Sequence, residues 1–118
     1  MEVSQIMEQI SANEEIALNL YNLDPDTPVE ELIKAVQEDG INNWHLNLQL
    51  LQQIKEDELD EAFANYIDKI YHYTGIRQET YRLILKAIEE DTDKYDPEIE
   101  EKDKAIQVLV DEIEAMVL

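Results

Sequence analysis

Glycine and proline are scarce in this chain, and their positions constrain its fold more than any other feature. Only two glycines and three prolines occur in 118 residues. Each stands where a run with helical periodicity begins or ends: the prolines come before such runs, and Gly40 and Gly75 come after them. Proline in the first turn and glycine just past the last one are typical of helices, and no run of alternating β-branched residues indicates a strand. The sequence therefore predicts an all-α protein.

The spacing of apolar residues predicts a single-domain antiparallel helical bundle of five to six helices over residues 1–118. The expected segments are about 2–22, 27–40, 43–55, 57–75, 76–90 and 96–118. Gly40 and Gly75 are expected to end the second and fourth segments, and Asp57 to cap the fourth. The capping-box pattern from Ser11 to Glu14 could break the first helix. The third and fourth segments could also form one long helix.

Apolar stripes on these segments predict the core. Val29 is expected to be buried in the second helix and Trp44 in the third, while Tyr66 and Tyr81 fit the stripes around Gly75. The last helix carries a near-heptad stripe that could pack in the bundle or pair with a partner helix. Its members are Ile99, Ile106, Leu109, Val110, Ile113 and Val117.

Composition is that of one folded domain. The hydrophobic fraction of 44% is ordinary for a globular protein, and the length suits one domain with a radius of gyration of roughly 13 Å. The chain has no cysteine, which excludes disulfides and thiolate chemistry. The start of the chain lacks a basic segment followed by an apolar run, and no long apolar run occurs elsewhere. We expect a soluble, cytoplasmic protein.

Charge is the most unusual property of the chain. Twenty-nine Asp and Glu residues face nine Lys and Arg, giving a net charge of −20. Such a chain repels phosphate backbones and anionic membranes, so neither nucleic acid nor membrane is expected as a direct partner. More than half of the net charge lies in two acidic runs, residues 56–61 and residues 89–103. A helical hairpin about Gly75 would bring the two runs together into one negative pole, which would steer a basic partner or serve only solubility.

The inventory of reactive side chains favours binding over catalysis. The two serines lie near the N-terminus, His45 and His72 are isolated, and neither glycine lies in a phosphate-binding loop. The acidic stretch that begins at Asp91 fails the EF-hand pattern, because Lys102 occupies the position of the bidentate glutamate. We expect no enzyme activity, no bound metal and no cofactor.

One alternative is a magnesium site. In the Gly75 hairpin, Glu58 and Glu61 would lie beside Glu90 and Asp93, and four carboxylates could bind Mg²⁺ and a nucleotide. This pair of motifs, Glu-x-x-Glu and then Glu-x-x-Asp, is similar to that of the all-α nucleoside-triphosphate pyrophosphatases of the MazG type. The similarity implies a Mg²⁺-dependent phosphohydrolase. It is confined to these two short motifs, and we do not assign the chain to that family.

Tyrosines near Gly75 suggest an interaction patch. Tyr71 and Tyr73 are two residues apart on a predicted helix, so both cannot face the core. Tyrosine is enriched at the energetic centres of interfaces, because it buries a large area and keeps a polar tip. We therefore expect at least one of the two to be exposed beside the turn.

The function predicted from sequence is that of a small acidic helical binding protein. It would neutralise or escort a basic protein partner, as an immunity protein, an antitoxin or an inhibitor of a nucleic-acid-handling enzyme does, and a homodimer is left open. A structural or regulatory subunit that docks through residues 97–118 is a further alternative. The predicted partner-binding residues are Glu56, Asp57, Glu58, Asp60, Glu61, Tyr71, Tyr73, Glu89, Glu90, Asp91 and Asp93.

Overall fold

Helices joined by short connections make up the part of the chain that the structure, a computed structural model, describes: residues 2–116. No strand occurs in that range, so the predicted all-α class is confirmed. In chain order the elements are α1 (Val3–Leu18), the 3₁₀ helix η1 (Asn19–Asn22), α2 (Val29–Lys34), the π-helix η2 (Ala35–Ile41), α3 (Asn42–Glu56), α4 (Glu61–Glu90) and α5 (Asp96–Ala115).

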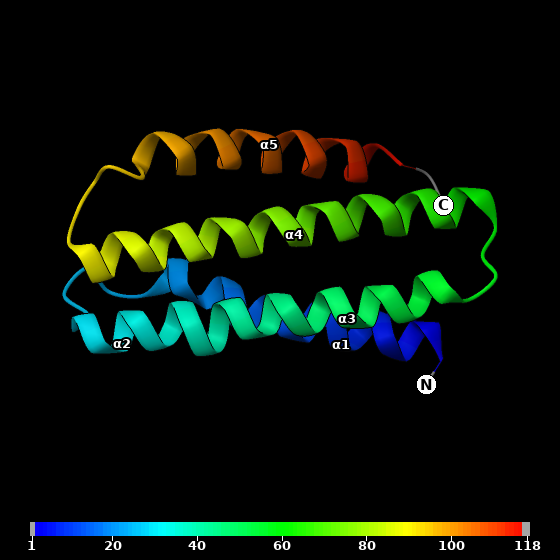
Figure 1. Ribbon diagram of the computed structural model, residues 1–118. Coiled ribbons are helices and arrows are strands. Elements are labelled where there is room, and N and C mark those ends of the chain that lie inside the picture. Colours follow the sequence, from blue (N-terminus) through cyan, green and yellow to red (C-terminus); the bar gives the residue numbers. More distant parts are fainter. Residues whose placement is uncertain (1, 117–118) are drawn as a thin grey trace.

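Four helical rods, rather than five or six separate helices, build the molecule. Elements α2, η2 and α3 follow one another without a break, so residues 29–56 form a single rod. Figure 1 shows that successive rods run in opposite directions along the long axis. The molecule measures 46 × 28 × 21 Å, and its radius of gyration of 15.4 Å exceeds that of a rounder chain of this length. The 30-residue helix α4 sets this length, because a helix rises about 1.5 Å per residue.

Neither glycine ends a helix, which corrects the prediction for both. Gly75 lies inside α4 with open space where a side chain would project, and Gly40 lies inside η2 against the ring of Tyr81. An interior glycine costs a helix only about 1 kcal/mol, which the apolar side chains buried on both sides of it outweigh. The predicted hairpin about Gly75 is therefore wrong.

The structure also decides the open alternative for the first helix and corrects two local predictions. Helix α1 continues through Ser11 without a break, because Ile10, Asn13 and Ala17 are buried along one face. Asp60, rather than Asp57, caps α4, and its carboxylate accepts a hydrogen bond of 2.9 Å from the backbone N–H of Phe63. Val29, predicted as a core residue, is 58% exposed because it stands at the first position of α2.

Two apolar clusters form the core. The first surrounds Trp44, whose ring packs edge to face on Tyr73 and Tyr81 with centroid distances of 6.2 and 5.7 Å. The hydroxyl of Tyr81 donates a hydrogen bond of 2.7 Å to the carbonyl oxygen of Ala17, which ties α4 to α1. The second cluster lies nearer the α3–α4 connection and consists of Ile6, Ile10, Leu51, Ile54 and Ile67.

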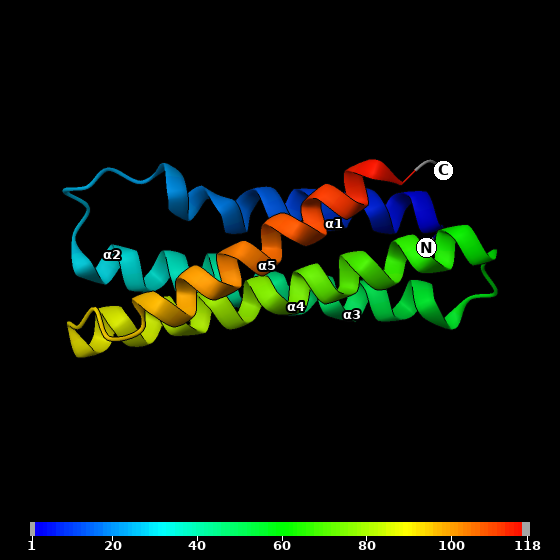
Figure 2. The ribbon, with the colours of Figure 1, turned by 90° about the horizontal axis from the view of Figure 1, so that it is seen from above.

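Helix α5 packs along α4 within the same chain (Figure 2). Ile106 and Leu109 are buried in this contact, while Ile99, Val110 and Ile113 are partly buried. Val117, the last member of the predicted stripe, lies outside the described residues. Ile106 and Leu109 of this stripe are therefore used inside the molecule. Within residues 2–116, no helix combines the length and the apolar character needed to cross a membrane.

The two glycines provide a matched test of this fold. A methyl group at Gly40 would overlap the ring of Tyr81, so Gly40→Ala should lower the free energy of unfolding by about 1–3 kcal/mol. The same change at Gly75 meets no atom within 4 Å and should raise it by about 0.5–1 kcal/mol through helix propensity. Urea denaturation measures both variants. Equal effects at the two positions would contradict the close contact between Gly40 and Tyr81.

Candidate functional site

The two acidic runs lie at opposite ends of α4. Residues 56–61 span the α3–α4 connection, and residues 89–103 span the end of α4, the α4–α5 connection and the first part of α5. Because α4 is continuous, its length separates Glu61 from Glu90 by about 43 Å. The single negative pole expected from the hairpin therefore does not form. The predicted acidic site residues are all exposed: Glu56, Asp57, Glu58, Asp60 and Glu61 at one end, and Glu89, Glu90, Asp91 and Asp93 at the other.

The same separation corrects the prediction of a four-carboxylate magnesium site. Glu58 and Glu61 stand at the start of α4, whereas Glu90 and Asp93 stand at its other end. Among residues 2–116, no group of three or more His, Asp or Glu side chains could hold a metal ion. The geometric basis for a phosphohydrolase site built from these four residues is absent.

Tyr71 and Tyr73 lie inside α4 and not beside a turn. Tyr73 is 7% exposed, and its hydroxyl donates to Glu14 Oε1 at 3.0 Å and accepts from Arg77 Nε at 3.2 Å. Tyr71 is half-buried, with Lys55 Nζ 4.5 Å from the centre of its ring. The expectation of a patch beside a turn is wrong, because α4 is continuous there. Tyr73 is buried in the first apolar cluster, and Tyr71 is partly buried against the second.

A more coherent candidate site lies at the α4–α5 end. A hollow of about 740 Å³ opens between α2, α4, the α4–α5 connection and α5. Three aspartates stand on its border, Asp91, Asp93 and Asp96, all of them exposed. Its remaining lining is apolar except for Thr92 and comprises Val29, Leu32, Ile84, Ala87, Ile88 and Ile99. We call this surface the acidic hollow.

The backbone of the connection is fixed by a helix C-cap. Asp91 adopts the left-handed conformation with φ 49° and ψ 58°, and the N–H of Thr92 donates to the carbonyl oxygen of Ala87 at 3.1 Å. This is the hydrogen bond of a Schellman motif, in which glycine is the usual left-handed residue. An aspartate at this position places a carboxylate at the border of the hollow at some conformational cost.

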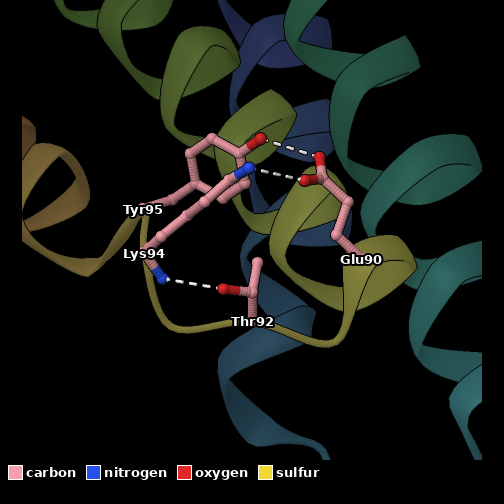
Figure 3. A network of polar contacts seen from close by, with 4 residues as sticks. All are labelled: Glu90, Thr92, Lys94 and Tyr95. Atoms are coloured by element: carbon pink, nitrogen blue, oxygen red, sulfur yellow. Dashed lines mark hydrogen bonds and ion pairs between the residues drawn. The ribbon is translucent and has the colours of Figure 1, made fainter.

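Side chains then hold the connection against the end of α4 (Figure 3). The hydroxyl of Tyr95 donates to Glu90 Oε2 at 2.7 Å, and Lys94 Nζ pairs with Glu90 Oε1 at 2.9 Å. The Lys94 backbone N–H donates to Thr92 Oγ1 at 3.1 Å. Hydrogen bonds from Tyr95 and Lys94 lower the pKa of Glu90. Glu90 is thus engaged within the chain, whereas none of the three aspartates on the border forms an ion pair among residues 2–116.

An apolar floor bordered by carboxylates can bind a group that is both basic and apolar. Burial of apolar surface supplies affinity, and the carboxylates select positive charge. Sequence reasoning found Asp91 and Asp93 but missed the floor, because it assigned Val29 and the other apolar stripe residues to the core. The available signal was the position of Val29 directly after Pro28, in the first turn of a helix, where the structure leaves it exposed.

The raised pKa of the buried Tyr73 predicts how the free energy of unfolding depends on pH. Burial, with a further contribution from Glu14, raises the pKa of Tyr73 from 10.0 to about 12. Between these two values the unfolded chain loses a proton that the folded chain keeps, so the free energy of unfolding should fall as pH rises, on the order of 2 kcal/mol.

Tyr73→Phe removes this ionisable group, and stability should then decline less steeply above pH 10.0. Some decline should remain, because burial also raises the pKa of Tyr81. Urea denaturation of both proteins across this pH range measures how the free energy of unfolding changes with pH. The difference between the two proteins at neutral pH gives the effect of the hydrogen bonds that the variant loses. Identical slopes would contradict the assigned role of Tyr73.

The left-handed aspartate gives a second prediction. Asp91→Gly should raise the free energy of unfolding by about 1 kcal/mol, because glycine adopts φ 49° without a Cβ penalty and one negative charge leaves a crowded surface. Asp91→Ala keeps the penalty and removes the same charge, so it serves as the control. Thermal denaturation measures the stability of both variants. An Ala variant as stable as the Gly variant would contradict the conformational explanation.

No protein-family model, no curated protein and no solved structure matches the chain. Functional inference therefore depends on the contacts, charges and shape of this chain.

Proposed function

We propose that this chain is a small acidic helical binding protein that neutralises or escorts a basic protein partner by electrostatic occlusion, without catalysis of its own. An immunity protein, an antitoxin or an inhibitor of a nucleic-acid-handling enzyme fits this description. The observation that carries the proposal is the acidic hollow, in which three exposed aspartates border an apolar floor. A charged patch alone would serve solubility equally well, but an apolar floor adds a place where a partner can be anchored.

The charge of the molecule is largely unbalanced within the fold. Of 29 acidic side chains, only four form an ion pair with a lysine among residues 2–116: Asp68, Glu79, Glu90 and Glu112. The field of the remaining carboxylates attracts a basic partner from a distance and raises the association rate. The same field repels competing nucleic acid.

The chain would occlude its partner by pairing with the partner's phosphate-binding side chains. Lysine and arginine side chains that normally bind a nucleic-acid backbone would pair with Asp91, Asp93 and Asp96, and arginine can do so in a bidentate manner. An apolar or aromatic side chain of the partner would enter the floor beside Val29 and fix the register. No covalent step is required.

The scaffold that presents this surface is, we infer, a single-domain antiparallel bundle. The alternating direction of the rods in Figure 1 supports this description. The ordered α4–α5 connection supports a preformed site, because Glu90, Lys94 and Tyr95 already hold it in place. We also propose a cytoplasmic setting, in which enzymes that handle nucleic acid act.

Affinity capture from the native host at low salt tests the proposal. The tagged chain should retain a basic protein, and the association rate of the purified pair should fall by about tenfold or more between about 50 and 500 mM NaCl. Surface plasmon resonance measures this rate. Failure to retain a basic partner, or an association rate that ignores salt, would contradict the function.

Matched neutralisations locate the contact. A triple variant with Asp91→Asn, Asp93→Asn and Asp96→Asn should weaken binding by about tenfold or more, because it removes the charged border of the hollow. The control is Glu56→Gln, Asp57→Asn and Glu58→Gln, which makes the same change in net charge at the opposite end and should alter affinity by no more than about threefold. Equal weakening by the two triples would rule out the hollow as the specific site.

A further inference from the structure

A second apolar depression lies between α1, α4 and α5, away from the acidic hollow. Helix α5 packs against α4, and α1 packs mainly against α3 and η2, so α1 and α5 stand on either side of one face of α4. In Figure 1, α5 lies above α4 and α1 lies below it, and in Figure 2 α5 crosses from α4 towards α1. The groove between them has a volume of about 240 Å³. We call it the α1–α5 groove.

Helical spacing organises the floor of this groove. Tyr66, Ile70 and Tyr73 line it from α4 at intervals of four and three residues. Met7 and Ile10 contribute from α1, and Val110 and Ile113 from α5. Tyr66, Ile70, Val110 and Ile113 are only partly buried, so apolar surface on the floor and on the α5 wall remains available to a partner.

Acidic residues border the groove on both walls. Glu14 lines it from α1 and Glu114 from α5. Glu8 and Glu15 are exposed and stand three residues before and four residues after Ser11, which also lines the groove, so they share its side of α1. Exposed Asp111 precedes Glu114 by three residues on α5. Among residues 2–116, no lysine or arginine lines the groove.

We propose that the α1–α5 groove binds an amphipathic helix of the basic partner. The apolar face of that helix would lie on Tyr66 and Ile70, and lysine or arginine side chains on its two flanks would pair with the glutamates on the walls. This inference rests on the proposed function for the basic character of the partner and names a structural element that the partner presents.

The shape and the charge of the groove both select this occupant. The lining follows α4 for about 10 Å, from Tyr66 to Tyr73, between side chains of α1 and α5. A helix laid along such a depression buries residues at steps of three and four. A second copy of this chain is disfavoured, because each copy carries a net charge of −20 and acidic groove walls. The acidic walls also disfavour nucleic acid. From Tyr73 to Ile88, the groove and the hollow are separated by about 22 Å along α4, so one partner could cover both.

A designed peptide tests the groove directly, whatever the identity of the partner. The probe is a fluorescent synthetic helix of about 18 residues with leucines at helical spacing on one face and lysines on both flanks. Fluorescence anisotropy on the full chain should show binding that weakens by about tenfold when the same residues are scrambled so that the apolar face is lost. Equal affinity for the two peptides would overturn the proposal, because charge alone would then explain the binding.

Neighbouring tyrosine substitutions on α1 supply the matched control. Ser11→Tyr places a large side chain in the groove and should weaken peptide binding by about tenfold. Ala12→Tyr adds the same side chain at an exposed position that does not line the groove, and should change affinity by no more than about twofold. Circular dichroism verifies that both variants fold. Equal affinities would overturn the proposal.

Charge variants test the walls. Glu15→Gln with Glu114→Gln should weaken the peptide more than Glu38→Gln with Glu101→Gln, which removes the same charge from exposed positions elsewhere. Equal weakening by the two pairs would overturn the role of the walls.

Sedimentation of the free chain tests the other occupant, a second copy of this chain. A dimer that Ser11→Tyr dissociates would assign the groove to that second copy. If the peptide does not bind but the chain still captures a basic protein in a salt-dependent manner, only the groove proposal is rejected. If the chain captures no basic protein, the proposed function is rejected.

Discussion

The contact between Tyr81 and Gly40 is the constraint on which the rest of this structure depends. Tyr81, near the middle of α4, lies against the backbone of η2, packs on Trp44, and donates a hydrogen bond to Ala17 at the end of α1. One side chain thereby joins three of the four rods. Glycine is required at position 40 because a backbone and a ring approach closely there, and not because the chain turns.

The continuity of α4 decides where the charge of this protein lies. A break at Gly75 would have gathered both acidic runs at one end, but the unbroken helix holds them about 43 Å apart. Three lysine ion pairs link neighbouring rods: Lys55 with Asp68, Lys69 with Glu112, and Lys102 with Glu79. They are partly exposed, and such pairs contribute about 0–1 kcal/mol each. The apolar clusters therefore supply most of the stability, and the acidic ends remain available for binding.

The acidic hollow and the α1–α5 groove combine the same two properties, an apolar floor and carboxylates around it. Sequence reasoning found the carboxylates, because charge runs are visible in the residue order. It missed both floors, since Val29, Ile84 and Val110 lie on stripes that are typical of buried core. Whether a residue on such a stripe is covered depends on the neighbouring rod: the packing of α5 on α4 buries Ile106 and Leu109 and leaves Val110 partly open.

By itself the sequence determined the all-α class and the approximate bounds of the first and last helices. These follow from local periodicity and proline placement, which act over a few residues. The tertiary structure alone decided that Gly40 and Gly75 lie inside helices, that Asp60 caps α4, and that the acidic runs stand apart. Glycine locally favours a helix end over a helix interior by about 1 kcal/mol. Only the burial of apolar side chains against distant residues, as where Tyr81 packs on Gly40, outweighs that preference.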